Sequence, residues 1–477
     1  MASAIPENDA SFTLGEVAAL TSGTLTGSAE VRVRGVVTDS RVSAAGKLFI
    51  ALPGERYDGH AFVTAALRAG AQALLVERNV GELGVPTVQV QSSYVALGKL
   101  AQAHRRRWPG RLVAVAGSAG KTTTRSAIST ALEAVAEGAV HFVAGNLNNR
   151  VGVPSVLLGL SARHRYAVVE IGTNALGEVL ELTQLAEPNV GVLTLIGLEH
   201  TEGLGSLSDI ESEEGSLFSG LAPHAVAIGN ADDARVLGQL AAANAERRLS
   251  YGFAESADYR VLERTPNARG GSRVVVARPT GAPLALDCPL VGRAGATALA
   301  AAIAASDACT GQALGAEALG LALARLGIGE AGRLTPVVLR DGTFLLDDSY
   351  NSNPASLPSS VAAAAELARA RSARLVLVLG EMRELGDESP RLHRESGQAV
   401  VDAGASLVVG VSGDARWLLE PFEKAGVNTH FAQDAEVAVR FLDAQLAPGD
   451  VVLIKASRGV RAERIVERLI ASRGRAE

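Results

Sequence analysis

The chain has 477 residues, 47% of them hydrophobic and 20% charged, which suits about three packed domains and excludes a disordered protein. Its net charge of −6 argues against a general nucleic-acid or anionic-membrane binder, and two cysteines are too few for a disulfide framework or a four-cysteine zinc site. With no visible signal peptide and no apolar run of membrane-spanning length, we expect a cytoplasmic protein without membrane insertion.

Residues 1–108 are predicted to form a small N-terminal α/β domain. Apolar runs at residues 36–38, 48–52 and 73–76 predict strands, and residues 60–69 predict a helix. Ser40 and Arg41 follow the first of these strands, where a backbone turn and a guanidinium can meet a pyrophosphate. Residues 104–110, with three arginines, a proline and a glycine, predict a linker with a solvated helix end.

A glycine loop opens the second domain, which we place at residues 109–330. An apolar run at 112–116 precedes Gly117-Ser118-Ala119-Gly120-Lys121-Thr122-Thr123-Thr124, and helical spacing follows. This order predicts a nucleotide-triphosphate site, although Val115 stands where the common pattern has a glycine. Lys121 would bridge the outer phosphates and Thr122 would help hold Mg²⁺. The predicted nucleotide ligands here are Gly117, Ser118, Gly120, Lys121, Thr122 and Thr123; the plain alternative is a glycine-rich turn.

The rest of this domain predicts a mainly parallel sheet. Fully apolar runs at 167–171, 190–194 and 225–228 suit strands buried on both faces. Residues 259–286 predict an antiparallel appendage, and residues 296–308 an alanine-rich helix.

Polar residues follow several of these strands. Glu170 ends one strand and His200 follows the next, so with Thr122 and water they could complete a Mg²⁺ shell. Alone, Glu170 could be a helix-cap or ion-pair residue and His200 a surface residue. Asn146, Asn148 and Asn149 predict either a simple turn or a polar loop that grips a sugar or peptide near the phosphates.

Residues 331–477 predict a third, doubly wound domain. Strands are expected at 344–346, 375–378, 407–409 and 451–454, separated by helical segments. Two acids, a tyrosine and two asparagines stand at the carboxyl end of the first strand and could address a ribose and a base: Asp347, Asp348, Tyr350, Asn351 and Asn353. A capped helix start at Pro354 is the plain alternative, and both can hold.

Taken together and in order, these motifs resemble the Mur ligases of peptidoglycan synthesis. The resemblance covers about residues 36–464. The motifs that carry it are Thr38-Asp39-Ser40-Arg41, the run from Leu48 to His60, the glycine loop, Asn146-Leu147-Asn148-Asn149 with Gly152-Val153-Pro154, Glu170-Ile171-Gly172, His200 before Gly205-Ser206, Asn230-Ala231-Asp232-Asp233, Gly332-Arg333, the run from Asp348 to Pro354, Gly380-Glu381-Met382-Arg383-Glu384-Leu385-Gly386 with His393, and Lys455-Ala456-Ser457-Arg458-Gly459.

The resemblance implies an architecture and a reaction. It implies an α/β protein with an N-terminal UDP-binding domain, a central P-loop-type domain and a C-terminal Rossmann-like domain, and we expect a monomer. It implies ATP-dependent ligation with Mg²⁺, in which the carboxylate of UDP-N-acetylmuramoyl-tripeptide becomes an acyl phosphate and D-alanyl-D-alanine displaces phosphate. Ser40 and Arg41 would bind the UDP part, and Asn146, Asn148 and Asn149 the muramoyl side. Domain closure would bring Arg333 and Asp348 onto the nucleotide.

Two departures from the family stand out. Glu214 occupies the place of a lysine that the family commonly carbamylates to hold a second Mg²⁺, so we expect an ionised Glu214 to serve there with His200. The alternative is that Glu211, Glu213 and Glu214 form a solvated acidic face. Ala294, Gly295 and Ala298 replace polar residues near the nucleotide, so adenine must be held differently. The expected catalytic set is Lys121, Glu170, His200, Glu214 and Arg333.

Three alternatives to this function remain at this point. A sibling ligase could add a single amino acid to a shorter precursor, although the Asp-Asn-Pro-Arg string of the diaminopimelate-adding relative is absent. A nucleotide-binding homologue that has lost ligation would fit the residues at 294–295. A generic P-loop kinase or ATPase would leave the asparagine loop and the third-domain motifs unexplained.

Overall fold

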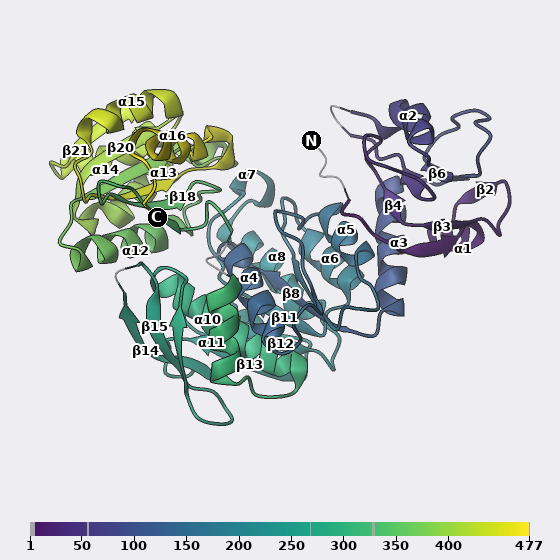
Figure 1. Ribbon diagram of the computed structural model, residues 1–477, viewed down its shortest axis with the longest axis horizontal. Coiled ribbons are helices and arrows are strands. Elements are labelled where there is room, and N and C mark those ends of the chain that lie inside the picture. The colour runs from purple at the N-terminus through teal and green to yellow at the C-terminus, as the bar shows by residue number, and fades with distance from the viewer. Residues whose placement is uncertain (1–4, 55–56, 268, 327–329, 477) are drawn as a thin grey trace.

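The computed structural model describes residues 5–54, 57–267, 269–326 and 330–476. Three layered α/β parts follow one another along the chain. In Figure 1 the N-terminal part lies at the right, the central part below, and the C-terminal part at the upper left, so the N- and C-terminal sheets flank the central one.

The N-terminal part contains a five-stranded sheet in the order β2-β7-β6-β5-β4. Strands β4 to β7 run parallel and β2 joins antiparallel to β7. A separate hairpin-like pair joins β1 to β3. The predicted strands and helix are confirmed here. The bounds are β1 Ser11–Thr13, β2 Thr24–Thr26, β3 Arg32–Arg34, β4 Val36–Val37, β5 Leu48–Ile50, β6 Ala73–Val76, β7 Thr87–Gln89, α1 Leu14–Thr21, η1 Gly59–Phe62 and α2 Val63–Arg68.

The predicted linker at residues 104–110 is wrong at its N-terminal end, because helix α3 (Ser93–Arg107) runs through it. Arg105 is buried, and its guanidinium donates to the carbonyl oxygens of Ala186 and Glu187 at 3.1 Å each. Successive helical residues point about 100° apart, so one of three consecutive arginines necessarily faces inward against α6 (Glu178–Ala186).

The central part is built on a nine-stranded sheet in the order β16-β15-β14-β13-β12-β11-β8-β10-β9. The predicted antiparallel segment exists but is continuous with the main sheet, since β14 pairs parallel with β13 before β15 and β16 turn antiparallel. The strands are β8 Arg111–Ala116, β9 Val140–His141, β10 Tyr166–Glu170, β11 Val190–Leu193, β12 Val226–Asn230, β13 Arg247–Gly252, β14 Tyr259–Pro266, β15 Ser272–Val276 and β16 Leu284–Cys288.

Two helices pack together over this sheet. Helix α10 (Gly292–Thr310) lies against α4 (Lys121–Glu133), and its many buried alanines allow the close approach. The other helices of this part are α5 Gly152–Leu158, α7 Thr201–Leu204, α8 Leu207–Ser219, α9 Ala234–Ala241 and α11 Ala316–Leu326.

The C-terminal part is a six-stranded sheet in the order β17-β18-β22-β19-β20-β21, parallel except for β17. All four predicted strands are confirmed, while the helix expected at Pro354 begins at Leu357. The bounds are β17 Thr335–Val338, β18 Phe344–Asp348, β19 Leu375–Gly380, β20 Ala405–Val411, β21 Asn428–Ala432, β22 Val451–Lys455, α12 Leu357–Ala370, η2 Gly386–Glu388, α13 Ser389–Val400, η3 Val401–Ala403, α14 Ala415–Lys424, α15 Ala435–Gln445, η4 Arg458–Val460 and α16 Glu463–Arg473.

Helix α12 docks the C-terminal part onto the central one, where it lies beside α10 (Figure 1). Val291, just before α10, belongs to the same buried cluster as Phe344 and Val361. Arg264 of β14 donates to both carboxylate oxygens of Glu366 at 2.8 Å. Apolar contacts and a bidentate ion pair therefore stabilise the same interface between the central and C-terminal parts.

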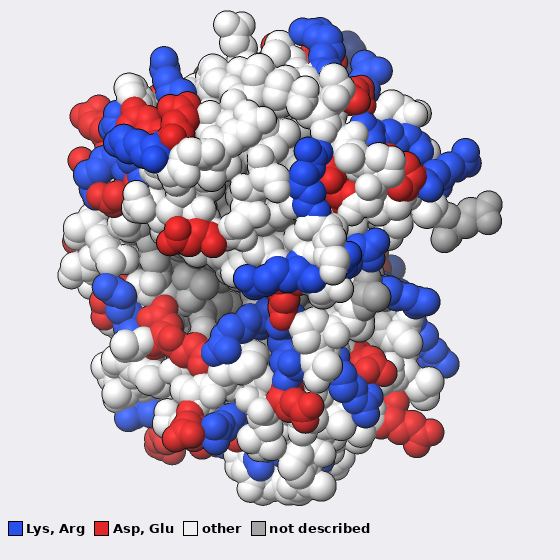
Figure 2. Space-filling model, turned by 90° about the vertical axis from the view of Figure 1, so that its left-hand side faces the viewer, with Lys and Arg blue, Asp and Glu red and all other residues white. Residues whose placement is uncertain are grey.

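Charged side chains are spread over the surface. On the face shown in Figure 2, basic and acidic side chains are interspersed rather than gathered by sign. Among the helices that the structure describes, none combines the length and apolar composition needed to cross a membrane.

We predict that Gly292→Ala weakens this docking. Gly292 has φ +72°, and an added Cβ would lie 2.8 Å from Ala363 Cβ of α12. Gly311, at the other end of α10, has φ +74° with no atom within 4 Å of an added Cβ. Both alanines cost left-handed strain of about 1–2 kcal/mol, but only the first also forces the two parts apart. Thermal unfolding should show a lower apparent Tm for Gly292→Ala than for the control Gly311→Ala, and equal Tm values would refute the idea.

Candidate functional site

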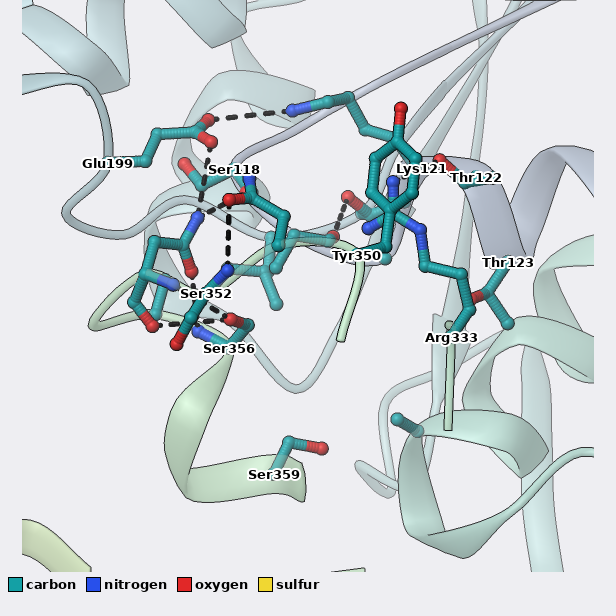
Figure 3. A pocket seen from close by; sticks show the side chains of 18 of the residues that line it. Ser118, Lys121, Thr122, Thr123, Glu199, Arg333, Tyr350, Ser352, Ser356 and Ser359 are labelled. Atoms are coloured by element: carbon teal, nitrogen blue, oxygen red, sulfur yellow. Dashed lines mark hydrogen bonds and ion pairs between the residues drawn. The ribbon is translucent and has the colours of Figure 1, made fainter. Parts of the chain in front are cut away.

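A cavity of about 660 Å³ lies between the central and C-terminal sheets. Its wall is formed by the glycine loop, the asparagine loop, the ends of β10 and β11, the start of α10, and the segments around Arg333, Tyr350 and Ser359 (Figure 3). In a mainly parallel sheet the carboxyl ends of the strands are where ligands bind, and this cavity stands at those ends.

The glycine loop has the backbone that a phosphate needs. Gly117 has φ +126°, and a Cβ there would lie 2.2 Å from Thr194 Oγ1, so no larger residue fits. Gly120 is left-handed at φ +83° and caps α4, leaving the first N–H groups of that helix directed toward the cavity. This arrangement is an anion site formed by backbone donors and a helix N-terminus.

Lys121 lies among carboxylates. Its Nζ donates to the Gly117 carbonyl and stands 3.6 Å from Glu199 Oε1 (Figure 3). Burial by itself lowers the pKa of Lys121, but the charges of Glu199, Glu214 and Glu170 outweigh it and raise that pKa. Lys121 is therefore protonated at neutral pH, and its ammonium group can bind phosphates.

Thr122 and Glu170 meet as predicted. Thr122 Oγ1 donates to Glu170 Oε2 at 2.9 Å, and Asn148 Nδ2 donates to Glu170 Oε1 at 2.8 Å. Arg333 reaches across from the C-terminal side, with Nη2 at 3.2 Å from Thr122 Oγ1 and its guanidinium 4.0 Å from the centre of the Tyr350 ring. Four predicted residues, Thr122, Glu170, Asn148 and Arg333, thus form one contact chain.

His200 lines the same cavity but has other partners. It is left-handed at φ 47°, pairs with Glu384 from the C-terminal part, and places Nε2 3.7 Å from Glu199 Oε2. The hydrogen bond from His200 lowers the pKa of Glu384. His200 therefore connects the two parts in this arrangement.

Glu214 lies beneath the glycine loop, fully buried, and Gly117 N–H donates to its Oε2 at 2.7 Å. The solvated acidic face is wrong for two of its three residues. Glu213 is also buried and accepts from Gly177 and Val179 N–H at 2.6 and 2.8 Å, which caps α6. Burial also raises the pKa of Glu214 above its usual value, against our expectation of an ordinary ionised glutamate.

Glu199 is the main site residue that the sequence reasoning missed. It is buried, and burial raises its pKa, with a further rise from the neighbouring Glu214. Its position directly before His200 was the only available signal. Asn353 was predicted for the ribose and base, but its contact with the glycine loop was not: its Nδ2 donates to Ser118 O at 3.2 Å and to Glu199 Oε2 at 3.3 Å, so the C-terminal part touches that loop.

The other predicted C-terminal residues support this edge of the cavity. Asp348 Oδ2 accepts from Lys455 Nζ and from Ser360 Oγ, both at 2.7 Å, so its carboxylate is held within the C-terminal part. Asn351 lines the cavity, and its carbonyl accepts from Lys455 at 3.0 Å.

Mg²⁺ fits the residues present. It prefers hard oxygen ligands and keeps several waters, and Thr122 and Glu170 offer a hydroxyl and a carboxylate. Oε1 of Glu199 and Oε1 of Glu214 are buried without a hydrogen-bond donor, which leaves oxygens to attract a cation. Within the described ranges no three His, Cys, Asp or Glu side chains cluster as a metal site, so phosphate oxygens and water must complete any shell.

The remaining predicted residues divide between two places. Asn146 and Asn149 line the cavity, and Asn149 Oδ1 also accepts from Gly152 N–H at 2.9 Å at the start of α5. Ser40 and Arg41 lie in the N-terminal part, outside the cavity wall; Arg41 is 70% exposed and pairs with Asp39. The structure therefore does not bring the proposed UDP residues together with the phosphate loop.

Sequence comparison decides the family. Three profiles match the chain: "Mur ligase family, catalytic domain" at residues 32–105, "Mur ligase middle domain" at 115–306, and "Mur ligase, glutamate ligase domain" at 332–458. The UDP-N-acetylmuramoyl-tripeptide–D-alanyl-D-alanine ligase of Escherichia coli is 36% identical over 96% of this chain and 98% of its own. This chain belongs to the Mur ligase family.

Other relatives of this Mur ligase also match more than nine-tenths of its length. The ligase of the same name from Bacillus subtilis is 32% identical, with 96% of this chain and 98% of the relative covered. A crystal structure of MurF from Acinetobacter baumannii superposes with a TM-score of 0.85 at 27% identity, covering 97% and 99% of the two chains. MurF from Thermotoga maritima in complex with ADP gives 0.78 at 26% identity, covering 91% and 96%. The predicted α/β class and three-domain architecture are confirmed.

We predict that Glu214→Gln raises the Mg²⁺ concentration needed for ATP turnover and lowers the maximal rate. Glutamine keeps the shape and can still accept from Gly117 N–H, but it cannot ionise, whereas a nearby cation would favour the ionised form of Glu214. A Mg²⁺ titration of turnover measures the effect, and Glu211→Gln, on the same helix and partly exposed, is the matched control.

Two results would contradict this role of Glu214. One is a Glu214→Gln titration that matches the parent protein. The other is reversible inactivation of the parent by removal of dissolved CO₂, because a glutamate, unlike a carbamylated lysine, needs none.

Proposed function

We infer that this Mur ligase is an ATP-dependent ligase that joins D-alanyl-D-alanine to UDP-N-acetylmuramoyl-tripeptide, giving ADP and phosphate, in peptidoglycan precursor synthesis. The observation that carries this inference is the convergence of Lys121, the Thr122–Glu170 pair and Arg333 in one cavity. Relatives with this named activity match more than nine-tenths of the chain, which includes the N-terminal part.

The geometry suits the chemistry of carboxylate activation. A carboxylate does not react with an amine, so it first attacks the γ-phosphorus of ATP, and the bond from that phosphorus to the bridging oxygen breaks to release ADP. The amine then attacks the acyl carbon, phosphate leaves, and the amine loses a proton. Lys121 and Arg333 offset the repulsion between two anions in the first step. Bound Mg²⁺ would add charge neutralisation on the phosphates, held by Thr122 and Glu170.

We assign the site residues as part of this proposal. Lys121, Glu170, His200, Glu214 and Arg333 would act at the phosphates. Thr122, Glu170, His200 and Glu214 would hold the metal ions, with Glu214 acting from beneath the glycine loop rather than from the cavity wall. Asp348 and Asn351 lie on the nucleotide side, together with the glycine-loop residues Gly117, Ser118, Gly120 and Thr123. Ser40, Arg41, Asn146, Asn148 and Asn149 contact the UDP-precursor.

The UDP residues lie outside the cavity, which fits a long substrate. The UDP end would rest on the N-terminal part while the peptide end reaches the phosphates past the asparagine loop. We further propose a cytoplasmic monomer with domains at residues 1–108, 109–330 and 331–477; these boundaries stay a prediction.

One observation favours a second candidate, a nucleotide-binding homologue without ligation. Ala294, Gly295 and Ala298 of the cavity wall offer no polar side chain to adenine, which leaves Arg293 and Thr297 as the polar residues of this stretch. Phosphate release from ATP with UDP-N-acetylmuramoyl-tripeptide, with and without D-alanyl-D-alanine, separates the two. Release that requires both substrates supports the ligase, and nucleotide binding without product supports the homologue.

We predict that Lys121→Ala lowers the ligation rate by about 10²-fold or more, because it removes the buried cation that meets the developing charge. The assay is product formation by the purified variant, with its thermal unfolding as a check on the fold. Lys99→Ala, an exposed lysine on α3, serves as the control and should match the parent. Near-normal product from Lys121→Ala would show that the phosphate site is elsewhere.

We also predict that Arg41→Ala raises the KM for the UDP-precursor while leaving the KM for ATP unchanged. Asp39 orients the exposed guanidinium by accepting from Nε at 2.9 Å and from Nη2 at 2.6 Å, which leaves Nη1 to meet a pyrophosphate. Steady-state kinetics with each substrate varied in turn measure both constants. An unchanged KM for the UDP-precursor would remove Arg41 from the site.

A further inference from the structure

Arg125 is a buried cation with no role so far. It lies one helical turn after Lys121 on α4, and its side chain is only 2% exposed. It contacts a second, very small cavity behind Glu170 rather than the large one, so it does not face the substrates. A fully buried guanidinium is costly unless it is paired, which makes its partners informative.

Three groups surround this guanidinium. Nη1 donates to the Val143 carbonyl, and Nη2 forms an ion pair with Glu330. Nε stands 3.6 Å from Glu170 Oε2, which is an ion-pair distance but too long for a hydrogen bond. Arg125 thus attracts the Glu170 carboxylate without using its lone pairs, which accept from Thr122 and Asn148.

The spacing of these contacts matches between two segments. Thr122 and Arg125 are three residues apart and so lie on one face of α4. Glu330 and Arg333 are also three residues apart, in the segment that leads into the C-terminal sheet. Arg125 pairs with Glu330 and Thr122 accepts from Arg333 at 3.2 Å, so the segment runs along that face of α4 with both ends held.

We propose that Arg125 is a positioning residue: it orients the Glu170 carboxylate and, through Glu330, sets where the Arg333 guanidinium lies over the phosphate loop. The planar fork of arginine allows one side chain to address Glu170, Val143 and Glu330 in three directions, which the single ammonium of lysine cannot do. The effects expected on turnover rest on the proposed function. The positioning of Glu170 and Arg333 by Arg125 would also affect nucleotide binding, which does not require ligation.

The test compares Arg125→Gln, Glu330→Gln and the double variant. Because orienting partners behind ligands typically change affinity or activity by about 10–100-fold, we expect Arg125→Gln to lower kcat/KM for ATP by about that factor. The KM for the UDP-precursor should not change. Glu330→Gln should act in the same direction, and the double variant should lose no more than Arg125→Gln alone, since both break one contact.

The control is Arg105→Gln, which removes another buried guanidinium, far from the cavity and bonded to Ala186 and Glu187 carbonyls. It should lower the apparent Tm without changing kcat/KM for ATP. An Arg125→Gln variant that behaves like this control, or losses that simply add in the double variant, would overturn the proposal. If Arg125→Gln does not fold, Glu330→Gln decides, because Glu330 is 25% exposed and tolerates change; parental kinetics would then refute the coupling.

Binding of a fluorescent ATP analogue without turnover separates this proposal from the proposed function. If the parent forms no ligation product but its analogue affinity still falls in Arg125→Gln and Glu330→Gln, the function fails and the positioning role stands. If the parent ligates but the variants bind and turn over as the parent does, the positioning role fails alone.

Discussion

Buried carboxyl groups surround a pocket that is suited to phosphates. The rest of the site depends on how the repulsion between these carboxylates and an anionic ligand is offset. Glu170, Glu199 and Glu214 are all at most 5% exposed. Negative charge next to an anionic ligand is unfavourable in a weakly screening interior. The balance comes from cations at fixed places, with Lys121 beside Glu199, Arg125 behind Glu170, and Arg333 across the opening. Divalent cations held by the carboxylates would complete it.

Helix α4 carries two of these cations, Lys121 and Arg125. It begins at the glycine loop, packs against α10 and α11, and lies over β10, whose end carries Glu170. Because the same helix carries Lys121, Thr122 and Arg125, a small displacement of α4 would change the phosphate site and the contact with the C-terminal part together. The fold therefore ties substrate chemistry to the arrangement of the two parts.

Local patterns in the sequence predicted much of the fold, and long-range contacts limited the rest. The strands at 73–76 and 375–378 could be predicted because each is a short apolar run between stretches of other residues. The glycine loop was readable because its backbone demands glycine at Gly117. Arg105 was misjudged because a run of like residues says nothing about which helix face is covered. Glu213 was read as part of a solvated face because its partners at 177 and 179 lie more than thirty residues away.

The site shows the same division. Thr122, Glu170 and Arg333 could be assigned from strand ends and from the family motifs, and the structure brings them into contact. Glu199 could not be assigned, and neither could the contact of Asn353 with the glycine loop, because both depend on how the C-terminal part touches that loop. The wall at Ala294, Gly295 and Ala298 has one more consequence, since Arg293 and Thr297 of α10 line the same cavity, as does Ser359 of α12 (Figure 3). A nucleobase that rests against this wall would meet side chains from α10 and α12 together, so the packing of α12 against α10 also shapes the surroundings of the nucleotide.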